Sequence, residues 1–410
     1  MNNLSNSVYI VDAVRIPRAK VRIKDQGQSS ESAYSGLKPI ELLEPLFHAL
    51  AERNQLDTEL VEDVLLGCAT QTQEQGANLA KIATLYAGWS DHVPGVTLNR
   101  FCCSGLDAIN LAAAKIMSGM ESLLVAGGVE QLSCVPMFAD NGPWYSDKKV
   151  MKKTRFLHMG LAADLIAQQN NYSRKDLDEL SIQSHQKAKH AQTKGYFNTS
   201  LVPVVDSKGE TRLSEDDGIR ENLVPEDLEN LAPRFSAFVE LGQTVVSQVY
   251  PEDELIAAHS TANSPALVDG ASLVLLASEK KCRQLNLKPR ARIVHFANAS
   301  DEPVKMLTGH IRAMDKMLQA TGLAAKDIDL WEVNESFAAS VLKFKQHFSI
   351  ADEKLNVNGS AIALGHPLGA TGGNLVSTLL DELERQNLKR GVVAICGGAG
   401  VGVVTLIERL

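Results

Sequence analysis

Two stretches of the sequence share one pattern and decide the fold. The first reads NRFCCSGLDAINLAAAKIMSG at 99–119 and is followed by LLVAGGVE at 123–130. The second reads NGSAIALGHPLGATGGNLVSTLLDELERQ at 358–386 and is followed by VVAICGGAGVGVV at 392–404. Each contains an Asn, a glycine-containing bend, a helix rich in small residues, and an apolar strand that runs into Gly-Gly. The repeated pattern predicts that the chain contains one structural unit twice.

The elements before each stretch also match. Their shared order is strand, helix, strand, at 8–15, 39–54 and 61–69 in the first copy and at 291–298, 306–322 and 328–335 in the second. Alternating β and α elements are common, so chance alternation is the alternative, but four elements in matching order favour a duplication. We therefore predict two similar α/β halves with mostly buried strands.

The segment between the copies differs from both in composition. Residues 131 to about 250 are polar, lysine-rich at 148–155 and partly helical, with an S-x-x-D cap at Ser173 that predicts a helix ending near Gly195. The first copy resumes at VDGASLVLLASE, residues 268–279. The predicted domains are a first half at 1–130 plus 251–280, an inserted loop domain at 131–250, and a second half at 281–410.

Composition excludes several classes of protein. The 410 residues are 44% hydrophobic and 22% charged, with a formal net charge of −8, which fits a globular chain and gives no basic footprint for nucleic acid. No apolar run reaches the roughly 18 residues of a membrane span, and the N-terminus lacks a signal peptide, so we expect a cytoplasmic protein. The six cysteines include no CxxC pair, so we expect free thiols and no metal site.

The first candidate catalytic group is Cys102, which stands just before the helix predicted after residue 103. The positive end of a helix dipole and its unpaired amide hydrogens favour a thiolate, which is a ready nucleophile. The alternative is that Cys102 and Cys103 are small core residues. This segment alone leaves both interpretations open.

The second candidate is His366, which precedes a helix in GHPLGATGG, residues 365–373. A lone histidine is more often structural than catalytic. However, its place in the second copy matches that of Cys102 in the first. If the copies pack about a pseudo-twofold axis, the two helix N-termini face one cavity, where a histidine activates a thiol.

The third candidate is Cys396 in CGGAGVG, residues 396–402, at the end of an apolar strand. Ten of the 29 glycines fall within residues 359–402, a density that suits backbone amides donating into a pocket. No helix follows these glycines, so dinucleotide binding is the weaker interpretation. A second thiol at this place is a candidate acid or base.

These motifs, in this order, resemble the thiolases, which cleave 3-ketoacyl-CoA or condense two acetyl-CoA. The resemblance runs along nearly the whole chain and rests on NRFCCSGLDA, NESFA at 334–338, NVNGSAIALGHPLGATGG and CGGAGVG. It is closest to bacterial degradative enzymes of fatty-acid or steroid side-chain oxidation. It implies duplicated βαβαβαββ halves in a five-layer α-β-α-β-α arrangement. It also implies acyl-CoA and CoA as substrates, no tightly bound cofactor, and a homodimer or homotetramer.

The resemblance also implies roles for individual residues. Cys102 would be the acylated nucleophile, His366 would take its proton, and Cys396 would protonate the leaving acetyl-CoA carbanion. His366 and a water held by Asn334 would donate to the thioester oxygen, while the amides of Cys102 and Gly398 would form a second oxyanion hole. The residues implied to contact substrate or CoA are His158, Met159, Arg220, Ser264 and Phe337.

Several points in the sequence depart from the family or leave alternatives open. Residue 336 is Ser where Ala is usual, and Pro265 replaces a Ser that contacts pantetheine in many members. The stretch 20–36 looks longer than usual and is predicted to be a surface loop. The lysines of 148–155 are either a solvated face or a phosphate contact. A decarboxylating ketoacyl-synthase type of condensing enzyme and a catalytically inactive CoA-binding scaffold are the alternative functions.

Overall fold

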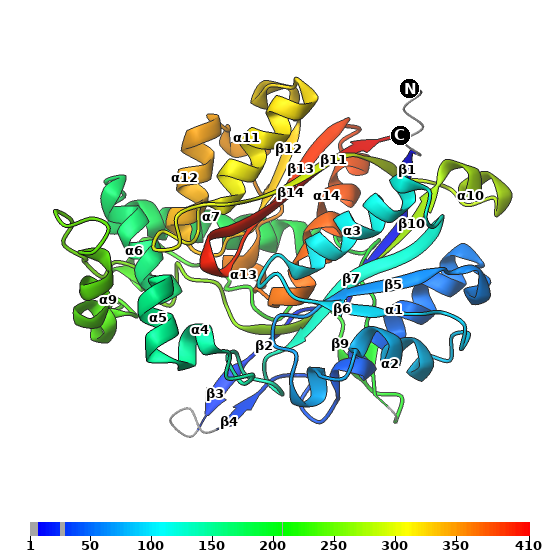
Figure 1. Cartoon of the computed structure of the whole chain (residues 1–410), viewed down its shortest axis with the longest axis horizontal. Helices are drawn as coiled ribbons and strands as arrows, with labels where there is room; N and C mark the ends of the chain where they lie inside the picture. Colours follow the sequence, from blue (N-terminus) through cyan, green and yellow to red (C-terminus); the bar gives the residue numbers. More distant parts are fainter. Residues whose placement is uncertain (1–6, 25–28, 207) are drawn as a thin grey trace.

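The strands alternate with helices along the chain, as the sequence predicts (Figure 1). The computed structural model describes residues 7–24, 29–206 and 208–410. Its strands are β1 Val8–Arg15, β2 Ala19–Lys20, β3 Arg22–Lys24, β4 Ser29–Glu31, β5 Asp63–Gly67, β6 Val96–Leu98, β7 Leu123–Gln131, β8 Val204–Val205, β9 Thr211–Leu213, β10 Val268–Ser278, β11 Ala291–Ser300, β12 Leu330–Val333, β13 Arg390–Cys396 and β14 Val401–Arg409.

The helices fall into three groups: those of the first half, those between the halves, and those of the second half. They are α1 Pro39–Asn54, α2 Leu79–Tyr86, α3 Ser104–Ser118, α4 Pro143–Ser146, α5 Lys148–Thr154, α6 Met159–Gln169, α7 Arg174–Thr193, α8 Pro225–Glu229, α9 Val239–Val246, α10 Glu279–Gln284, α11 Gly309–Thr321, α12 Ala338–Phe348, α13 Ala361–Leu364 and α14 Thr371–Arg385. Strand β1 and helix α1 have the bounds that the sequence predicts.

The strands of the two halves form one continuous sheet in the order β12-β13-β14-β11-β1-β10-β7-β5-β6. Within each half, parallel pairs lie at the outer side, β5 with β6 and β7 and β12 with β13. The halves join where β1 pairs with β11 through Val8–Ile10. Strands β7 and β10 are buried along their whole length, which matches their apolar sequences.

The three largest hydrophobic cores lie between the five layers. One core lies between the first half of the sheet and helices α1 and α2, and a second lies between the other half and helices α11 and α12. The third core holds α3 and α14 between the inward faces of both halves. In Figure 1, α3 lies between β14 and β7. The predicted five-layer α/β arrangement is therefore confirmed.

The second half departs from the predicted element order at one place. The first half follows β-α-β-α-β-α-β-β, but in the described chain no strand separates α12 from α14, and a single bridge joins Trp331 to Leu355. The side-chain amide of Asn356 replaces the missing strand, because it accepts from the Val333 N–H at 2.8 Å and donates to the Val333 carbonyl at 2.9 Å. Asn356 has a positive φ of 44°, which turns the chain away from the sheet.

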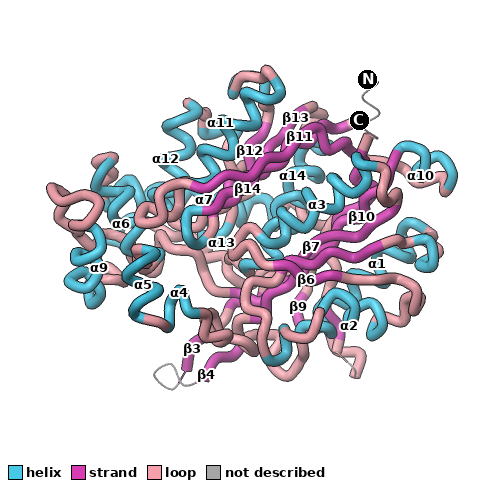
Figure 2. Tube along the Cα trace, in the orientation of Figure 1, coloured by secondary structure: helices cyan, strands magenta, loops and turns pink. Residues whose placement is uncertain are grey.

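The segment between the halves contributes helices α4 to α9 and long loops. Helices α5, α6 and α9 lie to the left of the large sheet in Figure 2. Helix α7 begins with the predicted cap. The Ser173 hydroxyl accepts from the Asp176 N–H, and the Asp176 carboxylate accepts from the Ser173 N–H. The surface loop predicted at 20–36 is only partly a loop. Strands β3 and β4 pair there, while residues 25–28 lie outside the described residues.

Candidate active site

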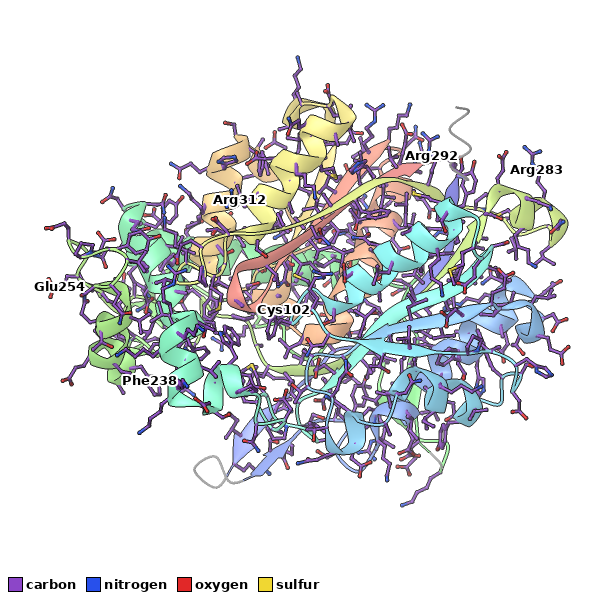
Figure 3. The ribbon with its side chains drawn as sticks, viewed as in Figure 1. Cys102, Phe238, Glu254, Arg283, Arg292 and Arg312 are labelled. Carbon is purple, nitrogen blue, oxygen red and sulfur yellow. The ribbon has the colours of Figure 1, made fainter. Side chains whose placement is uncertain are left out.

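A tight turn places Cys102 at the N-terminus of α3. Phe101 adopts a positive φ of 51°, and its N–H donates to the side chain of Asn99 at 2.7 Å. The hydroxyl of Ser104 accepts from the Arg100 N–H at 2.8 Å and donates to the Phe101 carbonyl at 2.6 Å. These bonds fix the turn, so the position of the Cys102 sulfur is set before any ligand binds. Figure 3 shows Cys102 near the centre of the molecule.

The resting Cys102 is a neutral thiol. Burial, which is the largest cause, and the nearby Cys396 and Glu130 together raise the pKa of Cys102 to about 12. The backbone N–H groups of Cys102 and Gly398 point to the sulfur and partly offset this effect. The amides at the helix N-terminus favour the thiolate in the predicted direction, but burial outweighs them in the resting protein. A base must therefore remove the proton.

The loop after β13 lies directly against the Cys102 turn. The Cys103 thiol donates to the Ile395 carbonyl at 3.3 Å, which makes Cys103 a buried bridge between the two loops. A Cβ atom built on Gly398 would lie 3.1 Å from the Phe101 ring and 3.2 Å from the Trp144 ring. This close approach favours glycine at residue 398, whose amide reaches the Cys102 sulfur.

Cys396 is buried among hydroxyl groups at the end of β13. Its sulfur lies 3.2 Å from the Ser336 hydroxyl and 3.5 Å from the Ser340 hydroxyl. Burial raises the pKa of Cys396, and the two serines partly oppose that change. Asn334 donates to the same Ser336 hydroxyl at 2.8 Å, and its Oδ1 atom is buried without a partner. Asn334 and Cys396 thus share one polar contact through Ser336.

His366 is held as a neutral imidazole. Its Nδ1 atom lies 2.7 Å from the Thr371 hydroxyl, which fixes the ring, and its buried Nε2 atom has no hydrogen-bond partner among the described residues. Burial, which is the largest cause, and the positive charge of Arg18 together lower the pKa of His366 to about 3. A neutral, unpartnered ring nitrogen can accept a proton, which is the chemistry that Cys102 requires.

The His366 loop and the Cys102 helix interlock through glycines. A Cβ atom built on Gly372 would lie 2.0 Å from the Leu106 nitrogen, and one built on Gly105 would lie 2.3 Å from the Gly369 carbonyl oxygen. Only residues without side chains fit at these contacts. The loops that carry Cys102, His366 and Cys396 therefore meet at one end of α3, with each half of the chain contributing to the site.

Comparison with known proteins agrees with this geometry. The thiolase N-terminal domain matches residues 8–249 and the thiolase C-terminal domain matches residues 287–409. The chain belongs to the thiolase family. The predicted resemblance is therefore confirmed, and the protein is an acyltransferase of the thiolase type.

Two curated thiolases are similar to this chain over its full length. A 3-ketoacyl-CoA thiolase of Serratia proteamaculans is 37% identical, over 98% of this chain and 100% of its own length. A steroid 3-ketoacyl-CoA thiolase of Mycobacterium tuberculosis is 36% identical, over 98% of this chain and 94% of its own length.

Two solved thiolase structures share the fold at 31% identity. The acetyl-CoA acetyltransferase of Bacillus anthracis has a TM-score of 0.85 and is covered completely, as is this chain. The dimeric peroxisomal thiolase of Saccharomyces cerevisiae has a TM-score of 0.86, with 100% of this chain and 99% of that chain covered.

An aromatic group in this thiolase brings together several residues predicted to contact substrate. The His158 ring lies 5.1 Å from the Phe235 ring, which lies 5.9 Å from the Phe337 ring. His158 caps α6, whose first residue is Met159, by accepting from the Gly160 amide. The loop containing Ser264 lies beside this group, since the Ala338 N–H donates to the Asn263 carbonyl at 3.1 Å. The Ser264 hydroxyl itself donates to the Ser260 carbonyl.

Arg220 lies apart from that group. Its N–H donates to the His185 ring at 3.0 Å, and its charge acts on Lys20 and His185. Lys20 belongs to β2 and His185 to α7. Gly218, two residues before Arg220, lies against α13, where its Cβ atom would be 2.9 Å from the Ala363 carbonyl oxygen. The described residues contain no group of three or more His, Cys, Asp or Glu side chains placed to hold a metal ion. Among the same residues, no helix is long and apolar enough to cross a membrane.

The sequence analysis missed a buried carboxylate that supports the site. Glu130, at the end of β7, accepts from the amides of Ala69 at 2.8 Å, Thr70 at 3.1 Å and Gly369 at 3.0 Å. It also accepts from the Gln75 side chain at 2.8 Å. Glu130 thus holds the His366 loop against the first half. The only sequence signal was its place after Gly-Gly at the end of a buried strand.

Proposed function

We propose that this thiolase cleaves 3-ketoacyl-CoA with CoA, giving acetyl-CoA and a shortened acyl-CoA, and that the same residues can run the reverse condensation. The observation that carries this proposal is the meeting of the Cys102, His366 and Cys396 loops at one end of α3. Relatives named as 3-ketoacyl-CoA thiolases support the choice of substrate. The three groups supply a nucleophile, a base and an acid within one site.

The first half-reaction forms an acyl-cysteine. His366 Nε2 takes the Cys102 proton as the sulfur attacks the C3 carbonyl, and the amides of Cys102 and Gly398 stabilise the resulting oxyanion. The C2–C3 bond then breaks, and its electron pair goes to C2. The Cys396 thiol protonates that carbon, so acetyl-CoA leaves and Cys396 remains as a thiolate.

The second half-reaction transfers the acyl group to CoA. The Cys396 thiolate takes the proton of the CoA thiol, and the CoA sulfur attacks the Cys102 thioester. When the tetrahedral adduct collapses, Cys102 leaves and recovers its proton from His366. Both thiols and the imidazole return to their starting states, so the cycle balances and predicts ping-pong kinetics.

The oxygen of the CoA thioester needs its own donors while C2 carries negative charge. His366 Nε2 is one donor once it is protonated. The unpartnered Oδ1 atom of Asn334 can accept from a water that donates to the same oxygen. This arrangement stabilises the enolate form of acetyl-CoA and so lowers the barrier to breaking the carbon-carbon bond.

The inserted segment completes the proposed enzyme. We assign His158, Met159, Phe337 and Ser264 to the channel for pantetheine and the acyl group, with Arg220 at the nucleotide end. The domain division is proposed as 1–130 with 251–280, 131–250, and 281–410. We also propose a homodimer or homotetramer, supported by a dimeric structural relative. A cytoplasmic site of action, supported by six free cysteines, and function without a tightly bound cofactor complete the proposal.

The test follows cleavage of acetoacetyl-CoA by CoA in wild type and three cysteine variants. Cys102→Ser should lose the acyl-enzyme detected by mass spectrometry. Cys396→Ser should still accept an acyl group from a simple thioester but fail at carbon-carbon cleavage. Cys134→Ser, a partly exposed thiol outside the site, is the matched control and should retain activity. An acyl label on Cys103, or no consumption of acetoacetyl-CoA, would show that the proposal is wrong.

A further inference from the structure

A cavity of about 910 Å³ lies in the inserted segment between helices α5 and α9. Its floor is apolar and includes Phe156, Leu157, Leu161 and Val245. Helix α9 can approach α6 because of Gly242, where a Cβ atom would lie 2.6 Å from a Leu161 methyl group. The cavity has the size of a site for a small-molecule ligand.

The cavity is separated from Cys102 by a short aromatic path. The Phe156 ring in its wall lies 5.0 Å from the Trp144 ring, which lies 5.2 Å from the Phe101 ring beside Cys102. His158, which we assign to the substrate channel, also lines the cavity and stacks on Phe238 at 5.6 Å. An acyl group on Cys102 that extends past these rings would enter the cavity.

One wall of the cavity carries positive charge. Lys148, Lys152 and Arg155 line it, at the spacing that places side chains on one face of a helix. Lys149 and Lys153 belong to the same helix but do not line the cavity. Within the described ranges, Arg155 pairs with Glu302 at 3.4 Å, whereas Lys148 and Lys152 have no ion-pair partner. Two uncompensated ammonium groups therefore lie beside an apolar floor.

We infer that this cavity binds the distal part of the acyl group, and that the preferred 3-ketoacyl-CoA has a bulky apolar body ending in a carboxylate. The inference rests on the proposed function. The apolar floor suits a hydrocarbon body, and Lys148 and Lys152 suit an anionic end. CoA phosphates are the other source of negative charge. An apolar cavity of this volume does not suit a diphosphate, and Arg220, assigned to the nucleotide, lies on other elements.

The test compares kcat/KM for two 3-ketoacyl-CoA substrates of equal length, one with a terminal carboxylate and one with a terminal methyl group. Wild type should prefer the carboxylate. Lys148→Ala with Lys152→Ala should reduce that preference roughly 3- to 10-fold, the range for two exposed charge pairs. Lys149→Ala with Lys153→Ala removes the same charge from the same helix and should leave the preference unchanged.

A second pair of variants tests the apolar part. Leu241 lines the cavity and is 67% exposed, so Leu241→Trp narrows the cavity with little risk to folding. It should lower kcat/KM for bulky substrates more than for acetoacetyl-CoA. Leu85→Trp, at a surface leucine of α2 that is 42% exposed, is the control and should not change this ratio.

The outcomes separate this inference from the proposed function. If wild type does not cleave acetoacetyl-CoA, the proposed function is wrong. If it cleaves acetoacetyl-CoA but shows no preference for the carboxylate, only the inference about the cavity is wrong. If Lys148→Ala with Lys152→Ala raises the KM of CoA as much as that of the carboxylated substrate, the two lysines face CoA phosphates, and the inference is overturned.

Discussion

Replacing Ser336 by alanine removes a hydroxyl group that connects two parts of the proposed mechanism. Its oxygen accepts from Asn334 at 2.8 Å and lies 3.2 Å from the Cys396 sulfur. When Cys396 gives its proton to the carbanion, the hydroxyl hydrogen can rotate and donate to the new thiolate, while the Asn334 amide holds the oxygen in place. Ser336 thus acts as a positioning residue through Cys396.

The size of the effect follows from the loss of that hydrogen bond. A hydrogen bond to a charged group stabilises it by about 1.5–3 kcal/mol, which corresponds to a loss of about 10- to 100-fold in the rate of carbon-carbon cleavage. Without the hydroxyl, the already raised pKa of Cys396 should rise further, because Ser336 lowers it. In the condensation direction, where Cys396 acts as the base, the rate should therefore rise with pH at a higher pH than in wild type.

The assay measures the pH dependence of acetyl-CoA condensation and, separately, single-turnover acyl transfer from a simple thioester. Ser336→Ala should reduce condensation more than acyl transfer. Condensation starts from the Cys396 thiolate, which must remove a carbon-bound proton, whereas acylation of Cys102 by a simple thioester starts from the Cys396 thiol. Ser340→Ala is the comparison, since its hydroxyl lies farther from the sulfur at 3.5 Å and also donates to the Leu307 carbonyl. An unchanged pH profile in Ser336→Ala, or a larger shift in Ser340→Ala, would refute the reasoning.

Three more predictions concern His366 and the residues that hold its loop in place. Because the pKa of His366 is lowered to about 3, its imidazole stays neutral as pH falls from 8 to 5. Protonation of His366 should therefore cause no fall in kcat/KM over that range. A fall in kcat/KM near pH 6.5 that His366→Asn abolishes would contradict this prediction. Gly372→Ala places a Cβ atom against the Leu106 backbone and should lower the melting temperature by several degrees more than Gly322→Ala, which meets nothing within 4 Å but has a positive φ of 69°. Glu130→Gln places an amide N–H group against the backbone N–H groups of Ala69 and Gly369. This variant should reduce turnover at least tenfold while its circular dichroism spectrum stays native. Wild-type turnover in the variant would show that Glu130 does not hold the His366 loop.

Much of the fold and the chemistry could be predicted because the relevant signals are local in the sequence. The apolar strands, the cap at Ser173 and the Gly-rich loops depend on neighbouring residues, so their positions agree with the structure. The missing strand of the second half could not be predicted, because Asn356 replaces it with a side chain that bonds to Val333, 23 residues away. The large rise in the pKa of Cys102 could not be predicted, because it depends on burial by residues that are distant in the sequence.

The cavity between helices α5 and α9 also could not be predicted from local signals in the sequence. The spacing of Lys148, Lys152 and Arg155 on one helix face was visible in the sequence. The apolar surface opposite them comes from α9, which begins at Val239 and has no local link to the lysines. Only the folded chain shows that the charged face and the apolar face line the same space.

The contacts between Gly105 and Gly369 and between Gly372 and Leu106 leave no room for a side chain at the boundary of the two halves. Because the backbones of the two halves touch at these glycines, the halves cannot move apart there to admit a larger acyl group. Substrates of different size must therefore fit into another part of the protein. The cavity between helices α5 and α9 lies outside this boundary. If the proposed cavity binds the acyl group, substitutions in α5 and α9 can change which acyl groups fit without disturbing the glycine contacts beside Cys102.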